Sequence, residues 1–337
     1  MRETIKNNGV MVNEYWNKKS KPFITVITPV YNRRSTILRT INSVDNQSFQ
    51  NIEYIIIDDG SSETIDDIIQ NYMKSTKLPV MFIKKTNGGV HTARNIGYKN
   101  ARGEMVLCVD SDDELMPDAC KIFYKTWKSI PKTKRKNYWQ IKAQCIDQDG
   151  KRTAKPFPDN INNLPKEKTI KYFSMANGEQ IGCRVSEIMK NNLFPEPKGI
   201  TFVIESIVWI PLEYRYNSWG INDVVRVYHK EGKDRLAGNW RENDQQKLRN
   251  SLWSRAYMLN NKELFTFGYL QYIKNVIKYC VVSILLLIIG DKEFVKQNSL
   301  NGMANNYWKI ILWIPSAVYV LILKIRQKMK KMVILMS

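Results

Sequence analysis

Short apolar runs alternate with amphipathic stretches from Pro22 onward, and this alternation predicts repeated β-α-β units. The apolar runs are nearly continuous, which is typical of strands buried on both faces of a parallel sheet. The predicted strands are Phe23–Thr28, Ile52–Asp58, Val80–Ile83, Met105–Val109, Tyr138–Ile146 and Val224–Tyr228. The predicted helices are Ser35–Asn46, Glu63–Lys74 and Thr92–Asn100. We therefore expect an α/β fold with a mostly parallel central sheet and helices on both faces.

The composition changes along the chain and predicts three segments. Residues 1–22 are polar and of mixed charge, so we expect an N-terminal arm without a secretory signal. Residues 23–235 carry the β-α-β pattern and are expected to form one α/β domain. Within it, residues 150–168 hold a glycine and three prolines and predict a surface loop or flap. Residues 236–337 read as a basic helical region.

Polar clusters follow three of the predicted strands, at 29–33, 58–62 and 110–113. Ligands of parallel sheets bind beyond the carboxyl ends of the strands, so these clusters are expected to meet at one edge. The last cluster places Asp110, Asp112 and Asp113 within four residues. Such carboxylates repel one another unless a cation lies between them, which points to a divalent metal with an anionic ligand. The alternative is a solvated acidic turn.

The charge balance sharpens the metal prediction. The chain has 52 Lys and Arg against 32 Asp and Glu, a formal charge of +20, yet it concentrates acids at this one site. A small cluster of acids in a basic chain suits the binding of a metal ion together with a phosphorylated substrate. Only His91 and His229 are present, which argues against a zinc centre and leaves Mg²⁺ or Mn²⁺. We expect His229 to be structural, and the five cysteines without a Cys-x-x-Cys pair favour the reducing cytosol.

Two strongly apolar runs, Tyr279–Gly290 and Ile310–Leu323, lie near the end of the chain. Twelve and fourteen residues fall short of the ~20 that span a bilayer. Residues 270–337 contain ten Lys or Arg and two acids, so we expect this region to lie on an anionic membrane surface. A helix pair packing on the first domain is the alternative. Nucleic acid is not an expected partner, because no binding module is recognisable.

The polar clusters resemble the motifs of family 2 glycosyltransferases. The segments that carry the resemblance are Ile27-Thr28-Pro29-Val30-Tyr31-Asn32-Arg33, Asp58-Asp59-Gly60-Ser61-Ser62, Asn87-Gly88-Gly89, Ala93-Arg94-Asn95-Ile96-Gly97 and Asp110-Ser111-Asp112-Asp113. The resemblance covers about residues 23–115 and is fainter to about residue 230. It implies a GT-A fold, a nucleotide-diphosphate sugar donor with a UDP-sugar favoured, Mn²⁺ or Mg²⁺, and inversion at the anomeric carbon. Residues 23–115 would be the nucleotide-binding half and residues 116–235 the acceptor half.

The resemblance also implies roles for single residues. The donor would be held by Pro29, Tyr31, Arg33, Asp58, Asp110 and Ser111, and the metal by Asp112. Asp113 would be a second ligand, or would cap a helix that begins near Pro117. Arg94 would offer a cation to phosphate or hold Asp58, or would be a structural ion-pair partner.

The catalytic base is the point at which this chain departs from the family pattern. Members of the family usually have a Glu-Asp pair at the start of a helix, and here Glu205 stands alone in that place. Burial in an apolar helix would give Glu205 a raised pKa suited to a base. A buried glutamate paired with an Arg would have the same sequence, and Glu196, between two prolines, is the reserve candidate.

The expected function is transfer of a single sugar to a glycan or lipid-linked acceptor in cell-surface polysaccharide biosynthesis, at the cytoplasmic face of the membrane. Processive synthases of this family carry a Gln-x-x-Arg-Trp motif, which this sequence lacks. The broken Glu-Asp pair favours an alternative of another class, a catalytically inactive nucleotide-binding or membrane-tethered scaffold. A dinucleotide-dependent oxidoreductase is set aside, because no Gly-x-Gly-x-x-Gly follows the first strand.

Overall fold

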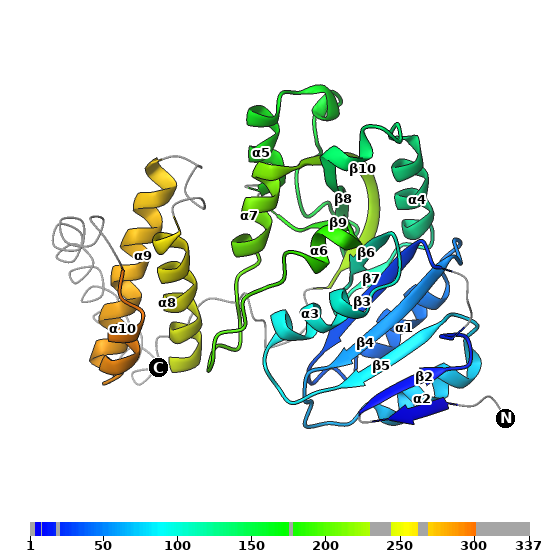
Figure 1. Cartoon of the computed structure of the whole chain (residues 1–337), viewed down its shortest axis with the longest axis horizontal. Helices are drawn as coiled ribbons and strands as arrows, with labels where there is room; N and C mark the ends of the chain where they lie inside the picture. The colour runs from blue at the N-terminus through cyan, green and yellow to red at the C-terminus, as the bar shows by residue number, and fades with distance from the viewer. Residues whose placement is uncertain are drawn as a thin grey trace, which may run out of the picture. The chain divides into compact units, whose positions relative to one another are not determined.

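The computed structural model describes residues 4–7, 9–17, 21–174, 178–229, 244–261 and 269–300 (Figure 1). The chain divides into two compact units. The first comprises residues 1–196 and 208–233, and the second comprises residues 197–207 and 234–337. The predicted boundary near residue 235 is close to the change of unit between residues 233 and 234. The assignment of residues 197–207 to the second unit was not predicted.

The first unit is built on a sheet whose described strands number ten (Figure 1). Their order is β1-β2-β5-β4-β3-β6-β9-β8-β10-β7. The strands are β1 (Thr4–Asn7), β2 (Val10–Asn13), β3 (Ile24–Val30), β4 (Ile52–Asp58), β5 (Val80–Lys84), β6 (Met105–Cys108), β7 (Glu114–Leu115), β8 (Tyr138–Asp147), β9 (Gln180–Val185) and β10 (Asn217–Tyr228). All six predicted strands are therefore confirmed, with ends that shift by a few residues, except for β10, which begins earlier than predicted.

The sheet is mixed, and the prediction of a mostly parallel sheet holds only for its centre. Strands β5, β4, β3 and β6 are parallel to one another, as are β8 and β10. Strand β9 runs antiparallel between β6 and β8, and β7 runs antiparallel beside β10. These two strands do not appear in the sequence pattern, because β9 is interrupted by Gly182 and Arg184 and β7 is only two residues long.

The predicted N-terminal arm is also corrected. Its described residues include β1 and β2, which pair with each other, and β2 pairs with Val80–Lys84 (β5) at the edge of the sheet. Asn13 closes this contact, since its side-chain amide donates to Leu78 O at 2.8 Å and its Oδ1 accepts from Val80 N at 3.0 Å. The amphipathic character of Val10–Asn13 is too short a signal to separate an edge strand from a polar arm.

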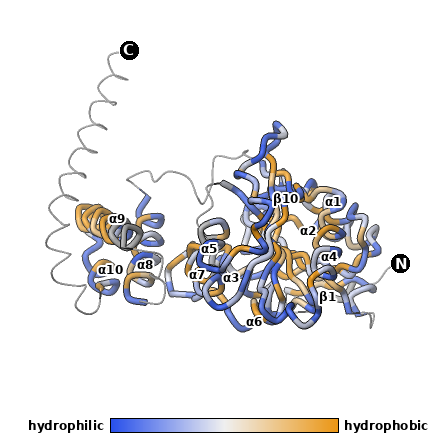
Figure 2. Tube along the Cα trace, turned by 90° about the horizontal axis from the view of Figure 1, so that it is seen from above, coloured by the Kyte–Doolittle hydropathy of each residue, from blue (hydrophilic) through white to orange (hydrophobic). Residues whose placement is uncertain are grey.

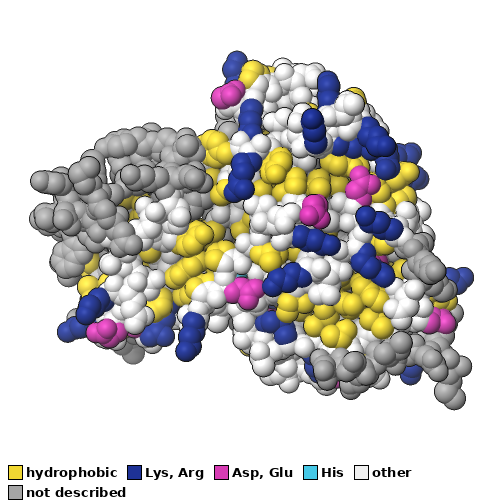
Figure 3. Space-filling view, in the orientation of Figure 1, with side chains coloured by type: hydrophobic (Ala, Val, Ile, Leu, Met, Phe, Trp, Pro, Cys, Tyr) yellow, Lys and Arg dark blue, Asp and Glu magenta, His cyan; other side chains and the backbone are white. Residues whose placement is uncertain are grey.

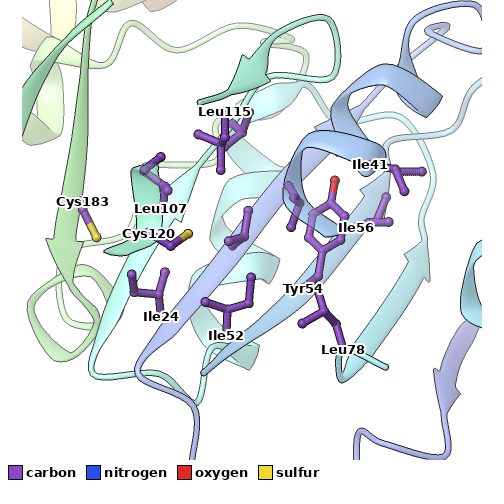
Figure 4. Packing of buried hydrophobic residues seen from close by; sticks show 14 of the residues in the cluster. Ile24, Ile41, Ile52, Tyr54, Ile56, Leu78, Leu107, Leu115, Cys120 and Cys183 are labelled. Atoms are coloured by element: carbon purple, nitrogen blue, oxygen red, sulfur yellow. The ribbon is translucent and has the colours of Figure 1, made fainter. Parts of the chain in front are cut away.

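Helices cover both faces of the sheet. The helices of the first unit are α1 (Ile37–Asp45), α2 (Asp66–Ser75), α3 (Val90–Asn100), α4 (Ala119–Ser129), α5 (Lys166–Ser174), α6 (Ser186–Lys190) and most of α7 (Ser206–Arg215). One core joins α1, α2 and α4 to one face of the sheet, and Figure 4 shows Ile24, Tyr54 and Ile56 within it. Strands β3 and β4 are buried along their whole lengths, as their continuous apolar runs predict.

Helix α3 lies on the opposite face of the sheet and approaches β3 closely. A Cβ atom at Gly97 would lie 2.5 Å from Ile27 Cγ2, so only glycine allows this approach. The hydroxyl of Tyr98 lies 3.3 Å from Cys108 Sγ at the end of β6. The Ala93–Gly97 segment is thereby fixed against the two strands that end at the polar clusters.

The second unit is helical in its described part. It contains α8 (Gln245–Asn260), α9 (Tyr269–Ile288) and α10 (Lys292–Gln297). Leu248 and Leu252 of α8 pack with Val282 and Leu286 of α9 in a separate core, and Figure 2 shows α9 as largely apolar. Arg249 donates to Asp291 at 2.6 and 3.0 Å and ties the start of α10 to α8.

The apolar run Tyr279–Gly290 therefore includes the second half of α9, and many of its side chains are buried against protein. Ile288 and Ile289, at its end, are 49% and 44% exposed. Among the helices that the structure describes, none combines the length and the apolar character needed to cross a bilayer. The second predicted run, Ile310–Leu323, lies outside the described residues.

Candidate active site

The loops after β3 and β4 are joined side by side. The two strands are parallel and in register, with Val30 beside Asp58. Asn32 has a positive φ of 50°, its N–H donates to Ser61 Oγ at 3.0 Å, and its Oδ1 accepts from Ser62 N at 2.8 Å. Asparagine tolerates this left-handed conformation better than most residues because its short side chain bonds to nearby backbone. The predicted meeting of the first two polar clusters is thus confirmed.

The predicted donor-site residues of these loops differ in exposure. Pro29 and Asp58 are buried at the ends of β3 and β4, and the Asp58 carboxylate accepts from Ser61 N at 2.9 Å. Tyr31 is 49% exposed, and the Arg33 side chain is 24% exposed. Asp58 therefore shapes the loop, whereas Tyr31 and Arg33 present a ring and a cation to solvent beside it.

The acidic loop after β6, residues 110–113, is held by the first turns of α1. Three consecutive backbone carbonyls of the loop accept hydrogen bonds from α1 and its preceding residue. The pairs are Thr36 Oγ1 to Ser111 O at 2.9 Å, Arg39 Nη2 to Asp112 O at 2.6 Å, and Thr40 Oγ1 to Asp113 O at 2.8 Å. With its backbone fixed in this way, the loop directs its carboxylates in different directions.

Asp113 points into the protein, which corrects both of its predicted roles. Its carboxylate is fully buried, lies 3.1 Å from Arg226 Nη1, and accepts from the backbone N–H of His229 at 3.0 Å. Burial raises the pKa of Asp113, and Arg226 opposes that rise. Helix α4 begins at Ala119 with Asp118 before it, so Asp113 does not cap it. The third acid of the cluster is thus an internal ion-pair partner rather than a metal ligand.

Asp110 and Asp112 remain at the surface and pair with arginines. Arg94 Nη2 lies 3.1 Å from Asp110 Oδ1, and Arg33 Nε lies 3.4 Å from Asp112 Oδ2. The Asp110 and Asp112 side chains are 42% and 25% exposed, and Ser111 between them is buried. Of the roles expected for Arg94, this contact fits the ion-pair partner, and it places the guanidinium beside the acidic loop.

Asp59, which the sequence pattern did not single out, binds backbone N–H groups at the N-terminus of α3. The Asp59 carboxylate accepts the N–H groups of Gly88 at 3.0 Å and Gly89 at 2.8 Å and pairs with Lys85. Gly60 follows at a φ of 76°, and a Cβ there would lie 2.6 Å from Asn87 N. A carboxylate at a helix N-terminus is favoured by the helix dipole. Asp59 thus connects the second and third polar motifs.

Both histidines of the chain lie near this edge. His229 Nε2 is 2.6 Å from Glu114 Oε1, which confirms a structural role. His91, in the first turn of α3, is fully buried, and neither ring nitrogen has a hydrogen-bond partner within the described structure. Burial lowers the pKa of His91 to about 4, so its imidazole is neutral at physiological pH.

The two surface carboxylates suit a hard divalent cation that is completed by a substrate. Across the described ranges, no group of three His, Cys, Asp or Glu side chains converges on one point. Mg²⁺ and similar ions are commonly bound by one or two carboxylates together with substrate phosphates and water. The partly exposed carboxylates of Asp112 and Asp110 offer oxygens of this kind.

The candidate bases lie on the segment before α7. Glu205 is half-buried and directly precedes α7, so the prediction that it lies within an apolar helix is wrong by one residue. It belongs to the second unit. Glu196, the reserve candidate, is exposed in a loop of the first unit and accepts from Asn95 Nδ2 at 2.7 Å.

Arg226 is the main site residue that sequence reasoning missed. Besides Asp113, it lies 3.2 Å from Glu179 Oε2, and its Nε lies 3.2 Å from Cys145 Sγ. One signal was available in the sequence. A lone arginine inside the strand Val224–Tyr228 must be paired if it is buried, because an isolated buried charge is strongly unfavourable.

Taken together, these features define a class of protein. The loops after β3 and β4 and the two surface acids, Asp110 and Asp112, lie at the carboxyl ends of parallel strands. Sheets of this type bind nucleotides at that edge. The family model for glycosyl transferase family 2 matches residues 25–172. The matched segment, residues 25–172, is that of a family 2 glycosyltransferase, and it contains most of the edge described above.

Curated relatives agree with this family. An uncharacterized glycosyltransferase of Haemophilus influenzae is 43% identical over 97 residues, 29% of this chain and 39% of that protein. The GalNAc(5)-diNAcBac-PP-undecaprenol beta-1,3-glucosyltransferase of Campylobacter jejuni is 27% identical over 210 residues, 61% of this chain and 64% of that protein. The chain thus spans less than two thirds of the length of either relative.

Solved structures share the fold. S. aureus TarS 1–349 in complex with UDP-GlcNAc has a TM-score of 0.53 at 17% identity, covering 82% of this chain and 89% of that one. The mannosyltransferase PcManGT from Pyrobaculum calidifontis, in complex with GDP-Man and Mn2+, has a TM-score of 0.51 at 15% identity, covering 90% and 88%. At these identities the likeness establishes a GT-A type of fold.

Proposed function

We propose that this protein transfers a single sugar, with inversion, from a nucleotide-diphosphate sugar to a glycan or lipid-linked acceptor in cell-surface polysaccharide biosynthesis. The observation that carries the proposal is the arrangement of the acidic loop. Its backbone and Asp113 are held from two sides, so that Asp110 and Asp112 face the edge where the nucleotide loops end. A UDP-sugar is the favoured donor.

The donor would lie along the loops after β3 and β4. The Tyr31 ring is exposed there and the Arg33 guanidinium is partly exposed, and they suit a base and a phosphate, while Asp58 holds the second loop. Arg94 stands beside Asp110 and adds a second fixed cation near the diphosphate. Arginine suits this task because its planar group forms paired hydrogen bonds with phosphate oxygens.

The reaction exchanges one bond at the anomeric carbon and transfers one proton. The acceptor hydroxyl oxygen attacks the anomeric carbon, and the bond from that carbon to the diphosphate oxygen breaks with its electron pair on the diphosphate. Glu205 would take the hydroxyl proton on the face opposite the leaving group. Mn²⁺ or Mg²⁺, held by Asp112, would supply neutralisation of the leaving diphosphate. Arg33 and Arg94 would bind and orient the phosphates.

A membrane-linked setting is supported by charge and by kinship. Basic side chains outnumber acidic ones on the face in Figure 3, in keeping with the formal charge of +20. The Campylobacter relative is named for an undecaprenol-linked substrate, and a further relative of Bacillus subtilis, 40% identical over 99 residues, is a putative teichuronic acid biosynthesis glycosyltransferase. We propose peripheral attachment to an anionic membrane at its cytoplasmic face.

A donor screen tests the proposal. Purified protein is heated with UDP, GDP and a panel of their sugars, with Mn²⁺ or with a chelator, and donor hydrolysis is measured in parallel. We expect one nucleotide sugar to raise the melting temperature only when metal is present, and to be hydrolysed slowly. The absence of both effects for every donor would contradict the proposal.

The second candidate function is an inactive nucleotide-binding or membrane-tethered scaffold. The lone Glu205 in place of a Glu-Asp pair is the observation that favours it. A scaffold would bind the nucleotide sugar with metal but would neither hydrolyse it nor transfer the sugar. The same screen therefore separates the two functions, because binding without any turnover supports the scaffold.

A further inference from the structure

Two glutamines beside the acidic loop have buried amide atoms that lack partners. Gln144 of β8 is fully buried, and neither its Oε1 nor its Nε2 has a hydrogen-bond partner in the described part of the chain. Gln180 of β9 lies directly opposite in the antiparallel pair, and its Oε1 is likewise buried without a partner. Native proteins rarely leave such groups unpaired, so each instance calls for an explanation.

A third glutamine on the same strand shows the ordinary arrangement. Gln140 precedes Gln144 by four residues and therefore points to the same face of β8. It is also buried, but its Nε2 donates to Glu213 Oε1 at 2.8 Å and to Ser218 Oγ at 3.0 Å. The protein thus provides hydrogen-bond partners for one buried amide on this face of β8. The lack of partners is therefore specific to Gln144 and Gln180.

The register of the sheet places the unpaired amides level with the acidic loop. Cys183 of β9 pairs with Leu107 of β6 on one side and with Ile141 of β8 on the other. Asp110 and Gln144 come three residues after Leu107 and Ile141, and Gln180 comes three residues before Cys183 on the antiparallel strand. Leu107, Cys183 and Ile141 face the core that the sheet forms with α1, α2 and α4. Since side chains alternate along a strand, Gln144 and Gln180 turn to the other face.

On that other face, α3, which carries Arg94, lies over β3 and β4, and Glu213 of α7 bonds to Gln140 of β8. Arg94 pairs with Asp110, so the row of amides begins beside the site proposed for the donor diphosphate. Gln180 is only half-buried whereas Gln144 is fully buried, so Gln180 lies at the solvent side of the row. A ligand that extends from the diphosphate across β9 and β8 would meet Gln180 first and Gln144 behind it.

We propose that Gln144 and Gln180 form a subsite that hydrogen-bonds the hydroxyl groups of a hexopyranose. A carboxamide offers both a donor and an acceptor, which matches neighbouring sugar hydroxyls that also do both. The ring is either that of the donor sugar or that of the acceptor. The inference rests on the proposed function, since it assigns the place where that reaction holds a sugar.

Stability gives the first readout. Methionine has nearly the length of glutamine without its polar atoms, so Gln144→Met removes the unpaired groups and retains the packing. We expect the melting temperature of Gln144→Met to equal or exceed that of the wild type. Gln140→Met is the matched control and should melt at a lower temperature, because it leaves Glu213 without one of its donors.

Binding gives the second readout and separates the two sources of the sugar. Affinities for UDP and for UDP-GlcNAc, with Mn²⁺, are measured by calorimetry for the wild type, Gln144→Met and Gln180→Met. A donor-sugar subsite predicts that UDP-GlcNAc binding weakens about 3- to 10-fold while UDP binding is unchanged. An acceptor subsite predicts that neither changes, but that KM for methyl glycoside acceptors rises by a similar factor.

Two results would overturn the subsite. One is a lower melting temperature for Gln144→Met, which would mean that its amide is paired in the folded protein. The other is unchanged UDP-GlcNAc affinity together with unchanged KM for the glycosides in both variants. A wild type that binds neither UDP nor UDP-GlcNAc, and no other nucleotide sugar, would instead contradict the proposed function itself.

Discussion

Arg226 and Asp113 form a buried ion pair, 3.1 Å apart, that fixes the acidic loop from inside the protein. Asp113 is fully buried and Arg226 is 5% exposed. Together with the hydrogen bonds from α1 to the loop carbonyls, this pair leaves Asp110 and Asp112 as the acids that face solvent. The three carboxylates of this loop are equivalent in the sequence pattern. In the structure, Asp113 is buried in an ion pair, whereas Asp110 and Asp112 lie at the surface.

Breaking this pair should destabilise the first unit strongly. Arg226→Met leaves the Asp113 carboxylate buried without its cation, and loss of one partner of a buried pair costs about 3–5 kcal/mol. Urea unfolding measures the change. The double variant Arg226→Met, Asp113→Leu should recover much of the loss. Arg34→Met, which breaks the exposed pair of Arg34 with Asp67, is the control and should have a far smaller effect. Equal losses in the two arginine variants would contradict the assignment.

Asp112 should control metal-dependent donor binding. We expect Asp112→Asn to fold normally, because its side chain is at the surface, and to lose about 100-fold in turnover. The Mn²⁺-dependent rise in melting temperature with the donor should disappear as well. Asp67→Asn, another surface acid paired with an arginine, serves as the matched control. If Asp112→Asn kept the full metal response, the cation would have to be held elsewhere.

Glu205 should be needed for turnover and not for donor binding. Glu205→Gln retains the shape of the side chain and removes the proton acceptor, so we expect a loss of 10²–10⁴-fold in the transfer rate. Donor affinity, measured by calorimetry, should be unchanged. Glu196→Gln is the comparison, since Glu196 is exposed and accepts from Asn95. A larger loss of turnover in Glu196→Gln than in Glu205→Gln would exchange the two assignments.

Glu213 should make stability depend on pH. Burial raises the pKa of this carboxyl, against the opposing effects of Lys142 and of hydrogen bonds from Ser218 and Gln140. Because its folded-state pKa lies above the ordinary value of 4.5, protonation favours the folded state. This contribution is complete at low pH and is lost as the pH rises through the raised pKa.

The measurement compares wild type with Glu213→Gln by urea unfolding at pH 5, 6 and 7. The free energy of unfolding of the wild type, minus that of the variant, should be larger at pH 5 than at pH 7. Glu187→Gln on α6, where the side chain is exposed, should show no such trend. A difference that is flat with pH, or that grows toward pH 7, would contradict the raised pKa.

Local pattern determined much of this protein. Strand β4 contains the apolar run Tyr54–Ile57, and a run of that kind is stable only when it is buried on both faces, so its position in a sheet followed from sequence alone. The meeting of the polar clusters followed as well, because parallel strands bring their carboxyl ends to one edge. The family resemblance of residues 23–115 rests on those same residues and agrees with the match over residues 25–172.

The tertiary structure decided what depends on contacts between distant residues. Arg226 meets Asp113 across more than a hundred positions, and Gln144 meets Gln180 only because β9 runs antiparallel between β6 and β8. Whether a carboxylate faces a cation site or an internal arginine depends on which side of its loop is covered, and a linear pattern does not contain that information. The sequence therefore identified the edge at which the chemistry gathers, and the fold determined which side chains face it.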